Sequence, residues 1–243
     1  MESLVKVMTQ KGSTEAEFDH YRDTYNDRVN ESIAFSGLRV DFFTRAKAAY
    51  LCDALDQHFP NPAALKVLDI GCGVGNYHQF LRGRIAALSG VDVSGECLDR
   101  ARNKNADVSY KVSDNAELPF ANGTFDCAFT ICVLHHVAPI NRKVFASEFR
   151  RVIRPGGLGL IFEHNPNNPL TRRVVSNCEF DHNAILLKAA ESEHLLSESG
   201  FFGVKTRFLF SIPAANRLLR IVDGWMSPFR LGAQYLTSGT VHH

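Results

Sequence analysis

The sequence predicts an α/β fold in which a mostly parallel sheet is covered by helices on both faces, as in an α/β/α sandwich. Near-continuous apolar runs of strand length alternate with segments of helical periodicity from about residue 66 to residue 162. The first of these runs, residues 67–70 (VLDI), leads into a turn with glycines at 71, 73 and 75. Hydrophobic residues make up 45% of the 243-residue chain and charged residues 22%, which is enough apolar material for one well-buried domain.

Residues 1–60 are predicted to form an N-terminal helical cap. Apolar side chains recur at helical spacing from residue 16 to residue 59, and Pro60 ends the pattern. Tyr21 and Tyr25 lie one helical turn apart, and two interpretations stay open for them: residues of a lid over a ligand, or aromatics that pack a helix on the domain.

Residues 61–243 are predicted to form the main domain. Its first five strands are expected at 66–70, 87–93, 108–112, 125–132 and 157–162, with helices at 75–82, 95–104 and 141–152 between them. The rest of the chain is expected to add insertions at about 163–190 and 211–230, a helix at 191–199, and strands at 203–210 and 232–237. Since parallel strands end at one edge of a sheet, the ligand crevice is expected at that edge.

Charge and cysteine content limit the partners and the compartment. The formal net charge is +1, from 27 basic and 26 acidic residues, which gives no reason to expect nucleic acid as a partner. Six cysteines without a CxxC pair favour a reducing, cytoplasmic location, and no secretory or membrane-spanning apolar segment is predicted. Cys178 and His182 have a ligand-like spacing, but no second pair completes a metal site, so no metal is predicted.

The glycine turn is expected to approach a ligand closely. Glycines at 71, 73 and 75 leave no Cβ in the way, whereas a dinucleotide fingerprint would place its third glycine at position 76, which is Asn. Asp92 ends the second strand about twenty residues further on, where an acid accepts hydrogen bonds from ribose hydroxyls. Asp114 follows the third strand and could accept from the amino group of an adenine. These positions predict a ligand with an unphosphorylated ribose.

Five motifs in order carry a resemblance to a known family. They are VLDIGCGVGN at 67–76, GVDVS at 90–94, VSDNAELPF at 112–120, FDCAFTICVLHHV at 125–137 and FRRVIRPGGLGLIFEHNP at 149–166. In these the chain resembles the class I S-adenosylmethionine-dependent methyltransferases, in particular the small-molecule branch with the ubiquinone-biosynthesis-like enzymes. The resemblance implies a Rossmann-like seven-stranded sheet with one antiparallel strand, and S-adenosyl-L-methionine as cofactor.

The resemblance also implies which residues hold the cofactor. The backbone of the three glycines would run beside the methionine portion, supported by Asp69, and the backbone near Ile131 and Cys132 would face the methionine end. The ribose would lie at Asp92 and the adenine near Asp114. The implied cofactor site consists of Asp69, Gly71, Gly73, Gly75, Asp92, Val93, Asp114, Asn115, Ala116, Ile131 and Cys132.

Methyl transfer from a sulfonium needs alignment first, and a general base only when the acceptor is a protonated group such as a hydroxyl. Candidate bases follow the fourth and fifth strands: His135 or its neighbour His136, and His164. One of the two adjacent histidines is expected to point elsewhere, and a helix-start role is the alternative for the pair. Glu163 is interpreted as orienting His164 or the substrate, or as a solvated or capping carboxylate.

The acceptor is predicted to be a small molecule, with oxygen favoured over nitrogen or carbon. An amphipathic helix at 214–226 is interpreted chiefly as packing on the domain, with a substrate lid or a peripheral membrane contact as alternatives. Arg172 and Arg173 either meet an anionic group or are solvated. Two other functions stay open: a NAD-dependent oxidoreductase, and a non-catalytic cofactor-binding member of the fold. The sequence makes no prediction of oligomeric state.

Overall fold

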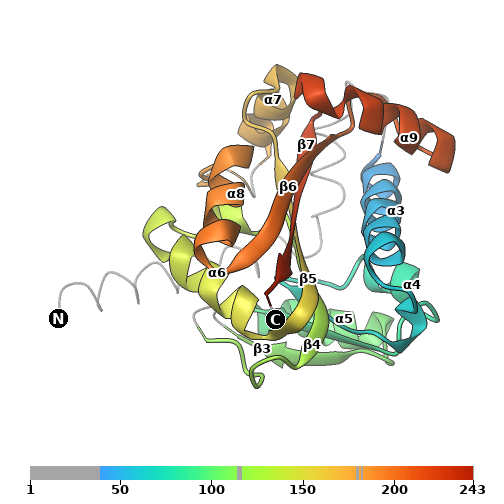
Figure 1. Cartoon of the computed structure of the whole chain (residues 1–243), viewed down its shortest axis with the longest axis vertical. Coiled ribbons are helices and arrows are strands. Elements are labelled where there is room, and N and C mark those ends of the chain that lie inside the picture. Colours follow the sequence, from blue (N-terminus) through green and yellow to red (C-terminus); the bar gives the residue numbers. More distant parts are fainter. Residues whose placement is uncertain (1–38, 114–116, 179–180, 182, 243) are drawn as a thin grey trace.

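A seven-stranded sheet forms the centre of the molecule in the computed structural model, which describes residues 39–113, 117–178, 181 and 183–242 (Figure 1). The strands follow the order β3-β2-β1-β4-β5-β7-β6. They are β1 (Lys66–Ile70), β2 (Ala87–Asp92), β3 (Ser109–Val112), β4 (Phe125–Ile131), β5 (Ile153–His164), β6 (Phe201–Leu209) and β7 (Gln234–Val241). Among these strands β7 runs opposite to all the others, with antiparallel pairing to β5 and β6, so the predicted mostly parallel, Rossmann-like sheet is confirmed.

Helices cover both faces of the sheet (Figure 1). On one side lie α3 (Val40–His58) and α4 (His78–Leu81), and on the other lie α6 (Arg142–Arg151) and α8 (Ala189–Glu198). The remaining helices are α5 (Gly95–Lys104), α7 (Pro169–Asn177) and α9 (Arg217–Met226). Successive strand residues therefore enter different cores: Val67 packs with α3, and Leu68 packs with α6 and α8.

The central strands and helices match their predicted positions, and the differences lie at ends. The helix expected at 75–82 is reduced to α4 because the preceding residues form turns, with Gly75 at a φ of +67°. β5 is longer than expected, so Glu163 and His164 are its last two residues instead of following it. The last strand begins at Gln234, two residues later than predicted.

The described part of the predicted cap is α3, and it contributes to the main core. Tyr50, Leu51 and Leu55 on its inner side are buried against the sheet. Tyr21 and Tyr25 lie outside the described residues. The domain boundary at residue 60 therefore stays a prediction.

Helix α9 is oriented opposite to the expectation that its apolar face packs on the domain. Leu218 and Trp225 are each 74% exposed, whereas Asp223 is fully buried. The Asp223 carboxylate accepts hydrogen bonds from the backbone N–H groups of residues 210, 211 and 212, and Arg220 pairs with Asp53 of α3 at 2.8 Å. These polar contacts attach the helix by its polar side, and only Leu219 of its apolar residues packs against the main core.

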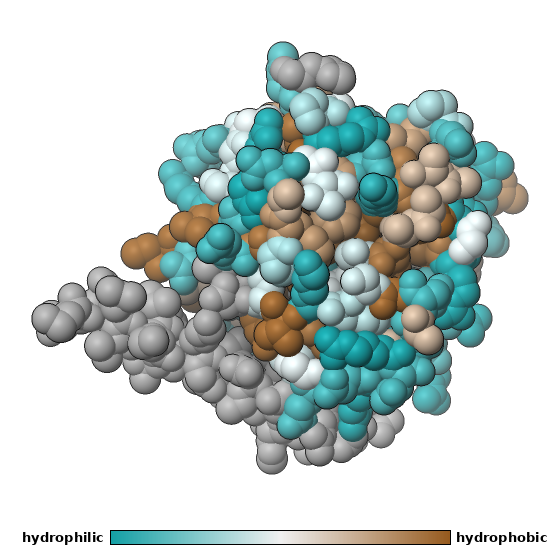
Figure 2. Space-filling view, turned by 90° about the horizontal axis from the view of Figure 1, so that it is seen from below, coloured by the Kyte–Doolittle hydropathy of each residue, from teal (hydrophilic) through white to brown (hydrophobic). Residues whose placement is uncertain are grey.

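The surface of the molecule is mixed in character. On the face in Figure 2, hydrophobic residues reach the surface in separate patches between hydrophilic ones, which is ordinary for a protein surface. Within the described ranges, no helix combines the length and the apolar character needed to cross a bilayer.

Candidate functional site

The glycine turn lies at the C-terminal end of β1, beside the point where the strand order reverses between β1 and β4. Its first residue is fixed by a 2.8 Å hydrogen bond from the Gly71 N–H to the carbonyl of Val91. All three glycines have positive φ values, of +74°, +51° and +67° along the chain. A side chain at these positions would therefore be strained, which explains the choice of glycine.

The three glycines face different surroundings. A Cβ added at Gly71 would come within 2.4 Å of Val133, and one at Gly75 within 2.8 Å of Asn105. A Cβ at Gly73 would meet nothing within 4 Å among the described residues. Gly73 is thus the glycine of the turn with open space beside it among the described residues.

A buried polar network lies behind the turn. Asp69 accepts a 3.0 Å hydrogen bond from the Nε2 of His78, and Nδ1 of the same ring lies 2.6 Å from the hydroxyl of Tyr110. Asp69 and His78 are almost fully buried, and burial raises the pKa of the Asp69 carboxyl despite the contact with His78. Asp69 is therefore bonded to the His78 ring behind the turn, and the role that the resemblance implies for it stays a prediction.

Asp92 ends β2 with its carboxylate against the glycine turn. Oδ2 accepts a 2.7 Å hydrogen bond from the Gly73 N–H, and Oδ1 accepts one of 3.0 Å from the Ser94 N–H. Burial raises the pKa of this carboxyl despite both bonds. Val93, next in the chain, is half-buried, and Ser113 hydrogen-bonds the carbonyl of Asp92 from the end of β3. Asp114, Asn115 and Ala116 lie outside the described residues, so the predicted adenine contact stays a prediction.

The end of β4 brings Ile131 and Cys132 to the same edge of the sheet. Cys132 has a φ of +59°, which is unusual for a residue other than glycine, and its N–H is bonded to the carbonyl of Phe162. Lys47 of α3 points inward and places its Nζ 3.7 Å from the Cys132 Sγ. Burial disfavours the Cys132 thiolate, but the charges of Lys47 and His164 outweigh burial and lower the pKa of the thiol to about 7.

His164 ends β5 beside Gln234, the first residue of β7. The Nδ1 of His164 lies 3.3 Å from the Gln234 Nε2, which also contacts the Cys132 sulfur at 3.9 Å. Gln234 is 8% exposed, and its Oε1 has no hydrogen-bond partner among the described residues. This buried amide oxygen is available to accept a hydrogen bond.

Glu163 contacts His135 instead of pointing to solvent or to His164. Its Oε2 lies 2.6 Å from His135 Nδ1, and its Oε1 accepts from the N–H groups of Val133 and Leu134 at 3.1 and 2.8 Å. Glu163 and His135 are at most 2% exposed. Both ring nitrogens of His135 face carboxylates, so neither Glu163 nor His135 is placed to touch a substrate directly.

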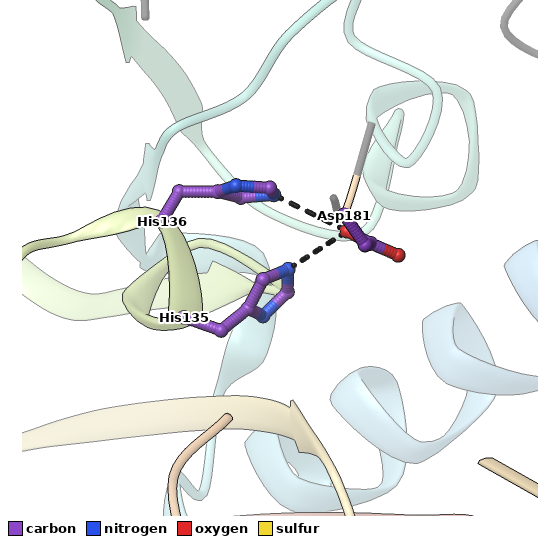
Figure 3. A group of neighbouring side chains, drawn as sticks. All are labelled: His135, His136 and Asp181. Carbon is purple, nitrogen blue, oxygen red and sulfur yellow. Dashed lines mark ion pairs between the residues drawn. The ribbon is translucent and has the colours of Figure 1, made fainter. Parts of the chain in front are cut away.

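His135 and His136 point toward one carboxylate, that of Asp181 (Figure 3). The Nε2 atoms of the two rings lie 3.3 and 3.5 Å from Asp181 Oδ1. The expectation that one histidine points elsewhere is therefore wrong. Asp181 is more than forty positions away in the chain, so no spacing pattern in the sequence could identify it. His182, half of the ligand pair considered from the sequence, lies outside the described residues.

The structure gathers the glycine turn, Asp92, Cys132 and His164 at the C-terminal edge of the sheet. Lys47 and Gln234 join them there, and sequence reasoning missed both. Lys47 stands between two alanines in the predicted helix. A lysine among apolar residues can be buried, and a buried charge needs a polar or charged partner. Gln234 carried no comparable signal, because its position depends on the register of β7.

Comparisons with known proteins agree with this geometry. Residues 68–161 match the protein family described as "Methyltransferase domain". An uncharacterized methyltransferase of Synechocystis sp. is 35% identical over 104 residues, which is 42% of this chain and 49% of that protein. An O-methyltransferase of Penicillium expansum is 27% identical over 66% of this chain and 58% of that protein.

The solved structures show the same fold. A structure from Thermotoga maritima, described as a SAM-dependent methyltransferase and possible histamine N-methyltransferase, superposes with a TM-score of 0.66. It is 20% identical and covers 93% of this chain and 99% of that one. The matched segment spans about half of the length of the Synechocystis protein and less than two thirds of the Penicillium one.

Proposed function

We propose that this chain, whose residues 68–161 match the methyltransferase-domain family, moves a methyl group from S-adenosyl-L-methionine to a small-molecule acceptor, with oxygen as the favoured target. The observation that carries the proposal is the contact between the glycine turn and Asp92. The Gly73 N–H and the Asp92 carboxylate meet at 2.7 Å, beside a position where a Cβ would find open space. Backbone and carboxylate together suit a nucleoside with an amino-acid tail better than a pyrophosphate.

In this proposal Asp92 accepts hydrogen bonds from the ribose hydroxyls, and the turn at Gly73 follows the amino-acid tail. Lys47 supports the second part, because a buried ammonium group near the end of β4 suits the carboxylate of such a tail. Asp114 would hold the adenine, as expected from the sequence.

Bound S-adenosylmethionine would supply an electrophilic methyl group, whose transfer breaks its bond to sulfur and forms one to the acceptor oxygen. The chain's own contribution is to hold the acceptor collinear with that methyl group and to exclude water, which is worth up to about 7–11 kcal/mol. The proton of an acceptor hydroxyl would go to His164, and Gln234 Oε1 would accept a hydrogen bond from another polar group of the acceptor. His135 and Glu163 then act as positioning residues that fix the loop after β4.

Isothermal titration calorimetry of the full chain with S-adenosylhomocysteine and, separately, with NAD tests the proposal. We expect binding of S-adenosylhomocysteine alone, and binding of NAD alone would favour the oxidoreductase. Methyl transfer from radiolabelled S-adenosylmethionine to a panel of phenols, sugars, carboxylic acids and amines then identifies the acceptor atom. Cofactor binding without turnover on any acceptor, together with copurification of another protein, would favour the non-catalytic alternative.

We also propose that α9 rests on a lipid surface. Ile221 is 43% exposed next to the exposed Leu218 and Trp225, and Phe229 and Leu231 follow at 69% and 61%. Exposed arginines at 217 and 230 flank this apolar face, a combination that suits anionic headgroups. Cosedimentation with vesicles of anionic lipid, and its loss in a Leu218→Glu variant, tests this contact, and equal binding by the variant would contradict it.

A further inference from the structure

We propose that His135, His136 and Asp181 form a binding site for a divalent transition-metal ion (Figure 3). Each residue offers one ligand atom, and all three atoms lie within 4.8 Å of one another. The cluster lies beside the proposed base, because the ring centroids of His135 and His164 are 5.2 Å apart, and a bound ion there goes beyond the proposed methyl transfer.

Two of the three separations between the ligand atoms match those around a metal ion. Two atoms that each lie about 2.1 Å from a tetrahedral ion are about 3.4 Å apart. The Nε2 atoms of His135 and His136 lie 3.3 and 3.5 Å from Asp181 Oδ1. Both values are longer than the most common N–H···O hydrogen bond, of about 2.9–3.0 Å, and they fit two ligands of a shared ion.

The surroundings of His135 resemble those of a metal ligand. Its Nδ1 lies 2.6 Å from the buried Glu163 carboxylate, so that nitrogen carries a proton, and Nε2 would present its lone pair to a bound ion. Glu163 is itself held by the two backbone N–H groups of residues 133 and 134. This arrangement of carboxylate, histidine and ion is the one that fixes ring orientation in metal sites.

The donor set selects the class of ion. Two imidazoles and one carboxylate suit zinc, iron, cobalt or nickel, whereas calcium and magnesium prefer oxygen ligands alone. The His136 and Asp181 side chains are 19% and 12% exposed, so the ion would be reachable from solvent. Three protein ligands leave a fourth position for water or a polar ligand. A bound ion would also tie Asp181 to the 3-10 helix Leu134–His136, which contains both histidines.

Zinc titration of the full chain against a chromophoric chelator tests the site. The protein is produced without an affinity tag and is treated first with a chelator to remove bound metal. His242 and His243 are replaced by Ala in every sample, because this pair of histidines could also bind zinc. We expect one equivalent of Zn²⁺ per chain. The His136→Ala and Asp181→Asn variants should each weaken zinc binding at least tenfold, whereas His194→Ala, at an exposed histidine of α8, should leave it unchanged.

The absorption spectrum of bound Co²⁺ distinguishes an ion held by these three residues from an ion held by any of the six cysteines. Co²⁺ bound by nitrogen and oxygen should give d–d absorption without a thiolate-to-cobalt charge-transfer band. Far-UV circular dichroism checks that each variant keeps the native fold, and His136, being partly exposed, is the substitution least expected to disturb it. A charge-transfer band, a stoichiometry near zero, or equal affinity in the His136→Ala, Asp181→Asn and parent chains would overturn the proposal.

Discussion

The hydroxyl of Tyr50 in α3 donates a 2.5 Å hydrogen bond to Asp223 Oδ2 in α9, and both side chains are buried. The two residues are 173 positions apart, so the bond joins the first described helix to α9 near the other end of the chain. The same carboxylate accepts from the backbone N–H groups of residues 210, 211 and 212. One buried carboxylate therefore holds the first three residues after β6 against α9.

Replacing Asp223 by Ala should destabilise the fold strongly. Several buried donors would lose their acceptor at once, and we expect the free energy of unfolding to fall by about 3 kcal/mol or more. Tyr50→Phe removes a single bond and should cost about 1 kcal/mol. Urea denaturation followed by circular dichroism measures both, and equal losses in the two variants would contradict the central role of Asp223.

Asp92→Ala should weaken binding of S-adenosylhomocysteine by more than tenfold, because the ribose would lose charge-assisted hydrogen bonds. Calorimetry measures the affinity. Asp92→Asn, which keeps an acceptor for the Gly73 N–H, serves as the matched control for the integrity of the turn. Unchanged affinity in the Ala variant would remove the ribose assignment.

Gly73→Ala and Gly71→Ala should differ in how much stability each variant loses. At Gly73 the added methyl group meets open space, so we expect a stability loss of only about 1–2 kcal/mol from the positive φ, together with at least tenfold weaker cofactor binding. At Gly71 the methyl group clashes with Val133, so the loss of stability should be larger. Thermal unfolding and calorimetry on both variants separate the effects. Normal cofactor binding by Gly73→Ala would place the ligand elsewhere.

His164→Asn should lower turnover at least 100-fold while the affinity for S-adenosylhomocysteine changes less than twofold, because a base is lost but no cofactor contact. The assay uses the acceptor identified from the panel, and His194→Asn on the surface is the control. An equal loss of cofactor binding would instead assign His164 a structural role.

The Cys132 thiol should react with iodoacetamide in proportion to its thiolate form. Because the pKa is lowered to about 7 from the ordinary value of 9.0, the thiolate predominates above pH 7 and is lost as pH falls through that value. The alkylation rate, followed by mass spectrometry, should reach half its maximum near pH 7. Lys47→Met should move this midpoint upward. Faster reaction at Cys52, whose pKa burial raises, would contradict the assignment.

The sheet could be predicted from the sequence because strands that are buried on both faces appear as near-continuous apolar runs. β1 and α5 begin and end at the predicted residues, since apolar runs and the Ser94 cap mark their limits. The glycine turn and Asp92 could also be predicted, because the turn follows β1 directly and Asp92 is the last residue of β2. The order of the strands at the end of the sheet came only with the family resemblance.

The orientation of α9 and the partners of His135 could not be predicted in this way. A helical pattern shows that two faces differ, but not which face meets the domain, and here a buried Asp223 decides. The contact between His135 and Asp181 depends on where Asp181, which follows α7 in the chain, lies relative to the 3-10 helix Leu134–His136. Such contacts join distant residues through tertiary packing, and no local spacing encodes them.

The outward orientation of α9 has a practical consequence, because Trp225 is the single tryptophan of the chain. Its indole ring is exposed to solvent on the side of the helix that faces away from the core. Intrinsic fluorescence should consequently shift to the blue when this helix enters lipid, whereas chain unfolding should change the emission maximum little. The molecule thus carries a built-in optical probe of one surface, and its unfolding must be followed by other means.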